Sequence, residues 1–152
     1  MLKLTAKDVC AALGVQKHRV RAWTSLPPFH HRPTRARSAR HFDTLDLLLM
    51  AILQSLEDVH GIRPSALEKV AAALMRFLSQ PRGLHSGTIA HLDVSTWEVH
   101  LVTSKSVLRP GLIIDVQQER NRVAEFLGVR HVQRELPLGP VVVPQKRHRG
   151  AK

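Results

Sequence analysis

Basic and polar side chains between residues 16 and 21 form the part of the chain best suited to binding a charged ligand. The segment reads Gln-Lys-His-Arg-Val-Arg, and a threonine follows three residues later. Lysine and arginine bind phosphate oxygens, and arginine, glutamine and threonine also hydrogen-bond the edges of bases. We therefore treat the segment as a candidate polyanion-binding site with six members: Gln16, Lys17, His18, Arg19, Arg21 and Thr24.

A second basic stretch lies in SLPPFHHRPTRARSARHF, residues 25–42. The pair Pro27-Pro28 prevents a helix from continuing, so we predict a loop with extended pieces rather than a packed element. Adjacent histidines in such a loop chelate metal poorly without fixed partners, and we expect no metal site there. The arginines of this loop, which extend the candidate binding surface, are Arg32, Arg35, Arg37 and Arg40.

Charge is unevenly distributed along the 152 residues, whose formal net charge is +11. Residues 1–42 hold nine Lys or Arg against one Asp, residues 43–80 hold three against five acids, and residues 137–152 hold four with no acid. A basic end and a basic tail are typical of proteins that bind polyanions, which by charge alone include DNA, RNA and anionic membranes. The mixing of the cations with prolines, and the lack of a long basic amphipathic helix, argue against a membrane partner.

Several classes of protein are not favoured by the composition. No stretch approaches the roughly 18 apolar residues of a membrane span, and the start lacks a secretory signal, so we expect a cytoplasmic protein. The single cysteine, Cys10, excludes an internal disulfide and a thiolate-rich zinc site, and we expect it to be a small buried residue. Without a glycine-rich phosphate loop, a nucleophile motif or any tyrosine, we predict no catalytic residue, no metal, no cofactor and no enzyme activity.

Two short helices are predicted to position the first basic group. Thr5 followed three residues later by an acid is a helix-start pattern, and Gly14 favours an abrupt helix end. A second helix over residues 16–23 would bury Val20 and Trp23 and turn its cations outward, where neither Lys17, Arg19 nor Arg21 has an acid nearby in the sequence. This is the pattern of a helix-turn-helix.

Two longer helices should follow. Asp43 begins a helix that Gly61 can end, and its leucines, isoleucine and methionine make it apolar nearly all round. Such a helix must be covered either by later elements of the chain or by a second chain. Ser65 and Glu68 predict a capping box for the next helix, which runs to Gln80.

From Thr88 the apolar period changes from helical spacing to alternation, which predicts a β-hairpin. A two-residue loop, Ser95-Thr96, would place Asp93 opposite Glu98, whereas a four-residue loop over 93–96 would place His91 opposite Glu98. We favour the longer loop. Residues 111–114 predict a third strand, and Asp115 predicts the start of a helix through Leu127.

The expected fold class is therefore mainly α with a small β part. Residues 1–80 would form a winged helix-turn-helix with the following helices, and residues 84–136 a hairpin plus helix that serves dimerisation or partner binding. Residues 137–152 would form a mobile basic tail.

The order LTAKDVCAALGV, HRVRAW, a proline-bearing loop and DTLDLLLMAIL resembles the MerR-type winged-helix DNA-binding domain, over Leu4 to Gly61. In that family an Arg-x-aromatic segment leads from the wing into a helix begun by an acid, as in Arg40-His41-Phe42-Asp43. The resemblance implies a divergent, compact bacterial or phage regulator. It implies that Lys17, His18, Arg19 and Arg21 face bases and phosphates, and that Arg35, Arg37 and Arg40 contact the backbone or the minor groove. The chain lacks the long dimerisation helix and the metal-binding cysteines common in the family, and Ala22-Trp23 replaces its usual tyrosine pair.

These observations predict a sequence-specific double-stranded DNA-binding transcription regulator, most simply a homodimeric repressor. Two other functions remain open. One is an excisionase-type architectural factor that bends DNA. The other is a protein-interaction module, binding for example an anti-repressor, whose basic surface is incidental.

Overall fold

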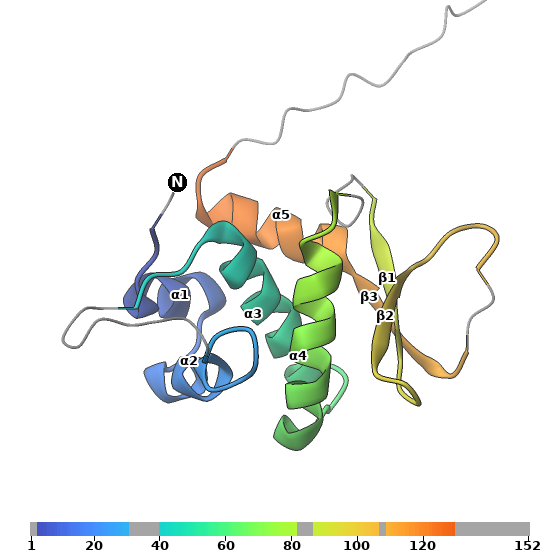
Figure 1. The fold of residues 1–152 in the computed structure, drawn as a ribbon. Coiled ribbons are helices and arrows are strands. Elements are labelled where there is room, and N and C mark those ends of the chain that lie inside the picture. The colour runs from blue at the N-terminus through green and yellow to red at the C-terminus, as the bar shows by residue number, and fades with distance from the viewer. Residues whose placement is uncertain (1–2, 31–39, 82–86, 107–108, 130–152) are drawn as a thin grey trace, which may run out of the picture.

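The computed structural model describes residues 3–30, 40–81, 87–106 and 109–129. Within them the fold is α+β, with five helices and one three-stranded antiparallel sheet, so the predicted fold class is confirmed (Figure 1). The sheet lies at one side of the molecule, and α3 and α4 lie between it and the first two helices. The elements are α1 (Ala6–Leu13), α2 (Lys17–Thr24), α3 (Thr44–Asp58), α4 (Pro64–Leu78), β1 (Ile89–Asp93), β2 (Glu98–Leu101), β3 (Gly111–Asp115) and α5 (Val116–Phe126).

The helix-turn-helix is formed by local interactions that the sequence predicts. The Asp8 carboxylate accepts a 2.7 Å hydrogen bond from the Thr5 amide, and the Thr5 hydroxyl accepts one of 3.4 Å from the Asp8 amide. Gly14 adopts φ +65°, a left-handed conformation that favours glycine and ends α1. The capping box and the turn are therefore confirmed.

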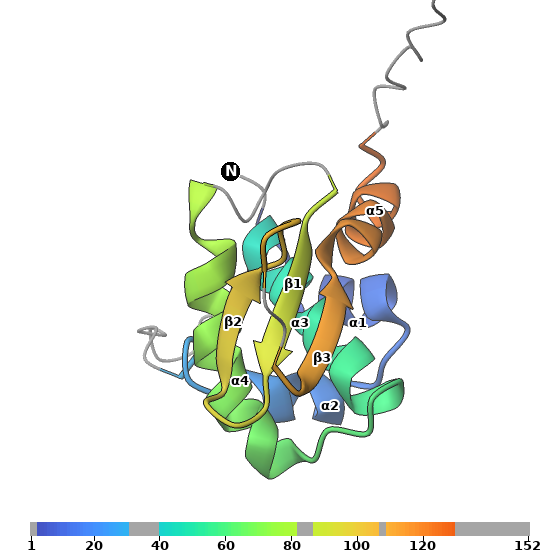
Figure 2. The same cartoon turned by 90° about the vertical axis from the view of Figure 1, so that its right-hand side faces the viewer.

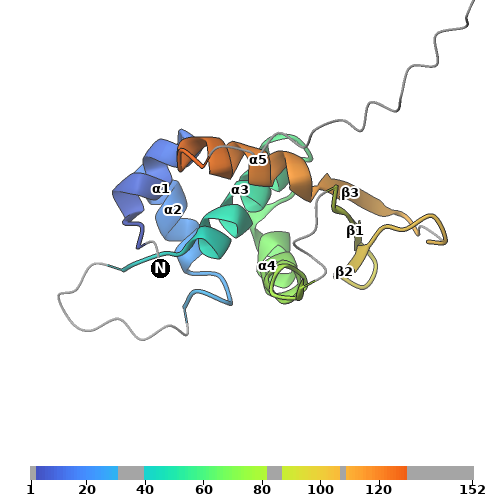
Figure 3. The same ribbon diagram turned by 90° about the horizontal axis from the view of Figure 1, so that it is seen from above.

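The central helix is α3, which lies between α1, α4 and α5 (Figure 3). Asp43 caps it as predicted, and the side chains from Leu47 to Leu53 are all buried. Its continuous apolar surface is thus covered by elements of its own chain. The need for a second chain over this helix, which together with the β-rich segment motivated the predicted dimer, disappears.

The start of α4 differs from the prediction. Pro64 is the first residue of the helix and Arg63 is its N-cap, without a side-chain cap. The predicted Ser65–Glu68 capping box is therefore wrong. Proline favours the first helical position because its fixed φ suits the helix and its missing N–H has no partner there.

The hairpin has the register expected for the two-residue loop, which was not the one favoured from the sequence. Asp93 lies opposite Glu98 and His91 opposite His100, so the favoured pairing of His91 with Glu98 is wrong. The Asp93 carboxylate accepts hydrogen bonds from the amides of Ser95, at 2.8 Å, and Thr96, at 3.2 Å, and these bonds stabilise the turn. β1 is the central strand, and β3 pairs with its other edge.

A single hydrophobic core joins the two predicted segments. Ala90, Leu92 and Ile114 of the sheet and Val123 of α5 belong to the same cluster of buried side chains as the helices of residues 1–80. The β-hairpin and α5 therefore pack on the N-terminal helices, and the predicted tail over 137–152 lies outside the described residues.

Candidate nucleic-acid interface

The outward face of α2 carries three exposed side chains that can bind a polyanion, Lys17, His18 and Arg21. Lys17 and Arg21 are one helical turn apart, so they project from the same face. None of the three forms an ion pair with any residue in the described part of the chain. Gln16, the N-cap residue, is also exposed, and its side chain makes no capping hydrogen bond.

The opposite face of α2 is anchored in the protein. Val20 and Trp23 are each 1% exposed, as predicted for core residues. The Trp23 indole N–H donates a 3.2 Å hydrogen bond to the Glu57 carboxylate at the end of α3. This contact fixes the rotation of α2 and thereby the direction of its outward face.

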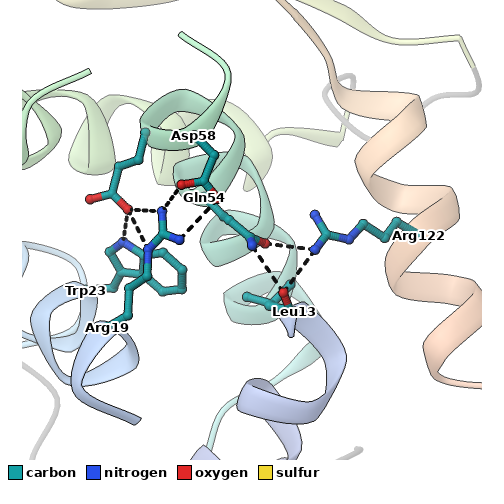
Figure 4. A network of polar contacts seen from close by, with 7 residues as sticks. Leu13, Arg19, Trp23, Gln54, Asp58 and Arg122 are labelled. Carbon is teal, nitrogen blue, oxygen red and sulfur yellow. Dashed lines mark hydrogen bonds and ion pairs between the residues drawn. The ribbon is translucent and has the colours of Figure 1, made fainter. Parts of the chain in front are cut away.

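Arg19 belongs to the anchored face. Its guanidinium donates to Glu57 at 2.7 Å and, through Nη1, to Asp58 at 3.1 Å, and it lies 5.1 Å from the centre of the Trp23 ring (Figure 4). No acid is near Arg19 in the sequence, but residues 38 and 39 positions away reach it in the folded structure, so the expectation that Arg19 lacks an acid to pair with is wrong. Arg19 holds α2 to α3, and we withdraw it from the set that faces DNA.

This ion pair has an electrostatic consequence for Asp58. Hydrogen bonding from the Arg19 guanidinium, which stabilises the charged carboxylate, holds the pKa of Asp58 below its ordinary value. In turn, the bond to Asp58 raises the pKa of Arg19, so this pair stays charged over the physiological range.

The turn between α1 and α2 is held by a second set of polar contacts, also visible in Figure 4. The Leu13 carbonyl, which the helix leaves without a partner, accepts hydrogen bonds from Gln54 Nε2 at 3.1 Å and Arg122 Nη2 at 3.2 Å. Arg122 also donates to Gln54 Oε1 at 2.8 Å. Sequence reasoning missed these residues because no local pattern links them to Leu13, which lies 109 residues before Arg122.

The basic loop after α2 is tied down at both ends. The amides and carbonyls of Leu4 and Phe42 pair at 2.8 Å, and Arg40 Nη1 donates a 3.0 Å hydrogen bond to the Thr24 carbonyl. Phe29 is buried against the edge of the Phe42 ring, so the first part of this segment is packed, contrary to the prediction.

Two predicted site residues therefore have structural contacts. Arg40 is half-buried with its guanidinium on the Thr24 carbonyl, and the Thr24 hydroxyl donates to the Arg21 carbonyl at 2.8 Å. These contacts use polar groups that were expected to meet DNA. The remaining loop arginines, Arg32, Arg35 and Arg37, lie outside the described residues.

Three general observations bear on other kinds of site. Within the part of the chain that the structure describes, no group of three or more His, Cys, Asp or Glu side chains is placed to hold a metal ion. Over the same ranges, no helix has the length and apolar character to cross a membrane. Cys10 is half-buried against the core, rather than fully buried.

Comparisons with protein-family models, with curated proteins and with solved structures found no match for this chain.

Proposed function

We propose that this protein binds double-stranded DNA sequence-specifically as a transcription regulator, with α2 in the major groove. The observation that carries the proposal is the asymmetry of α2, which exposes Lys17, His18 and Arg21 while its other face is anchored by Trp23 and Arg19. An α-helix fits the major groove, where its side chains reach both base edges and flanking phosphates.

The position of the basic loop supports the same function. Its first described residues and its return at Phe42 are both held beside α2, the latter through Arg40 and the Thr24 carbonyl. The described residues on both sides of the segment that carries Arg32, Arg35 and Arg37 therefore lie beside the proposed recognition helix. This arrangement of helix, glycine turn, helix and basic loop supports the proposed relation to MerR-type winged-helix domains.

A homodimeric repressor remains part of the proposal. Two copies would place two α2 helices in successive major grooves, on half-sites about one helical turn apart. Repression would follow from occlusion of a promoter, and the protein would then act in the cytoplasm on the nucleoid. Sedimentation at micromolar concentration, with and without operator DNA, tests the dimer.

Selection of bound fragments from random duplex DNA tests the function directly. We expect enrichment of one sequence motif by the wild-type chain, and loss of preference for that motif when Lys17 and Arg21 are both changed to alanine. Arg76→Ala is the matched control, because Arg76 is an exposed cation on α4 rather than α2. Recovery of random sequences by the wild type, or an unchanged preference in the double variant, would contradict the proposal.

A further inference from the structure

A groove runs along the unpaired edge of β3. The strand order β2-β1-β3 leaves one edge of β3 without a partner strand among the described residues (Figure 2). Three consecutive residues of β3, Ile113, Ile114 and Asp115, line a pocket of about 380 Å³. Because successive residues of a strand point to opposite faces, three in a row line one pocket only along the strand edge. The pocket therefore offers unpaired backbone N–H and C=O groups to an occupant.

The groove is acidic. Its other walls are the end of α3 and the first turns of α5, and its described lining includes the carboxylates of Asp58, Asp115 and Glu119 with Arg122 as the one Lys or Arg. Glu119 is 12% exposed, and burial raises its pKa although Arg122 lies 3.6 Å away. Asp58 is already paired with Arg19, so a cationic occupant would compensate chiefly the carboxylates of Asp115 and Glu119.

The pocket also has apolar side chains in its walls. Ile113 is 46% exposed, and Val59 at the end of α3 is exposed beside the same pocket. An occupant that combines an apolar extended segment with positive charges would satisfy both kinds of wall.

The C-terminal part of the sequence has this composition. Residues 140–149 read PVVVPQKRHR, a run of β-branched residues followed by three cations, and residues 137–152 contain no acid. Pro140 and Pro144 are four positions apart, an even number, so in a strand their missing N–H groups point to the same side. The N–H groups of Val141 and Val143 point to the other side. A strand with this pattern can add to a sheet edge with its prolines facing solvent.

The length of the chain permits this docking within one molecule. Val141 lies 12 residues after Val129, the last described residue, and 12 residues extend to at most roughly 40 Å. The groove lies at the first turns of α5, and the chain leaves α5 at its C-terminal end. The 11 residues of α5 span about 16 Å. The segment can therefore return along α5 to β3.

We propose that residues 141–149 of this chain bind in the β3 groove as an added edge strand. Val141 and Val143 donate their N–H groups to β3, and Lys146, Arg147 and Arg149 lie against the carboxylates of the groove. The proposal does not depend on DNA binding, and its test contains no DNA.

Hydrogen–deuterium exchange of the full-length chain, read at residues 111–115, tests it. The double variant Val141→Pro with Val143→Pro removes both donated N–H groups. We expect exchange of the β3 amides to become about thirtyfold faster, since each of the two hydrogen bonds contributes about 1 kcal/mol, a factor of about five. Val142→Pro is the matched control, because the N–H that it removes points away from β3. It should leave β3 exchange unchanged.

A second arm of the experiment tests the charges. Lys146→Glu with Arg147→Glu should accelerate β3 exchange by a similar factor, whereas Lys152→Glu, outside the proposed strand, should not. Equal exchange in the wild type and both double variants would overturn the proposal. So would protection that rises with protein concentration, which would assign the groove to a second copy. Protection confined to residues 44–48 and 123–127, which border a separate apolar pocket, would also overturn it.

Discussion

The two faces of α2 carry similar side chains but have different surroundings. Arg19 and Arg21 are two residues apart, yet Arg19 contacts two carboxylates and an indole ring, whereas Arg21 is exposed to solvent. The comparison shows that a basic residue on a candidate recognition helix acquires its role from the elements packed against it. One face positions the helix, and the other is left to bind a partner.

The largest effect should come from the anchored face. Trp23→Ala would remove a fully buried ring and leave a cavity, and would also leave the Glu57 carboxylate without its indole donor. We expect a loss of about 3–5 kcal/mol in the free energy of unfolding, measured by urea denaturation. A loss below about 1 kcal/mol would show that Trp23 does not anchor α2.

Arg19→Ala should have the next largest effect on stability. The change removes hydrogen bonds to Glu57 and Asp58 and leaves both carboxylates close together, so we expect a loss of about 1–2 kcal/mol, after allowance for the 26% exposure of the Arg19 side chain. Arg19 is a positioning residue in our proposal. Its replacement should therefore weaken DNA binding without changing the slope of log affinity against log salt concentration. A slope reduced by about one would instead show a phosphate contact.

Arg21→Ala should give the opposite result to Arg19→Ala. Because the Arg21 side chain is exposed, the free energy of unfolding should change by less than about 0.5 kcal/mol. Affinity for the selected DNA should fall about tenfold, and preference for it over random DNA should decrease. Titrations at several salt concentrations, compared with Arg76→Ala, provide the measurement. Indistinguishable binding by the two variants would remove α2 as the recognition helix.

The smallest effect concerns pH. The pKa of Asp58 is lowered in the folded protein from its ordinary 3.8, so the stabilisation from its pairing with Arg19 is fully present well above pH 3.8 and is lost as the pH falls below it. As the pH falls below about 5, the free energy of unfolding of Asp58→Asn should therefore decrease less than that of the wild type. Asp58 is 48% exposed, so the difference should be small. Parallel acid-denaturation curves for the two proteins would argue against this ion pair.

The features that sequence reasoning predicted correctly are those decided within a few residues. The Thr5–Asp8 capping box, the Asp43 and Asp115 caps and the left-handed Gly14 all depend on atoms no more than four residues apart. The apolar spacing of α3 likewise predicted its burial. In contrast, the capping of α4 was mispredicted because two start patterns, Pro64 and Ser65, overlap and the proline prevails.

The errors in the sheet and in the site have different causes. The register of the hairpin depends on how the Asp93 carboxylate engages the turn, and alternation of side chains alone allows several registers. The role of Arg19 depends on Glu57 and Asp58, which reach it only because α3 packs against the first two helices.

By itself, the sequence determined where α1, α3 and α5 begin, which face of α2 is apolar, and how strongly positive the first 42 residues are. These properties follow from backbone geometry and side-chain chemistry over one or two helical turns. The tertiary structure alone decided which cations remain exposed, what covers α3 and what holds the Gly14 turn, because those outcomes depend on groups 38 to 109 residues apart that meet only after the core has formed.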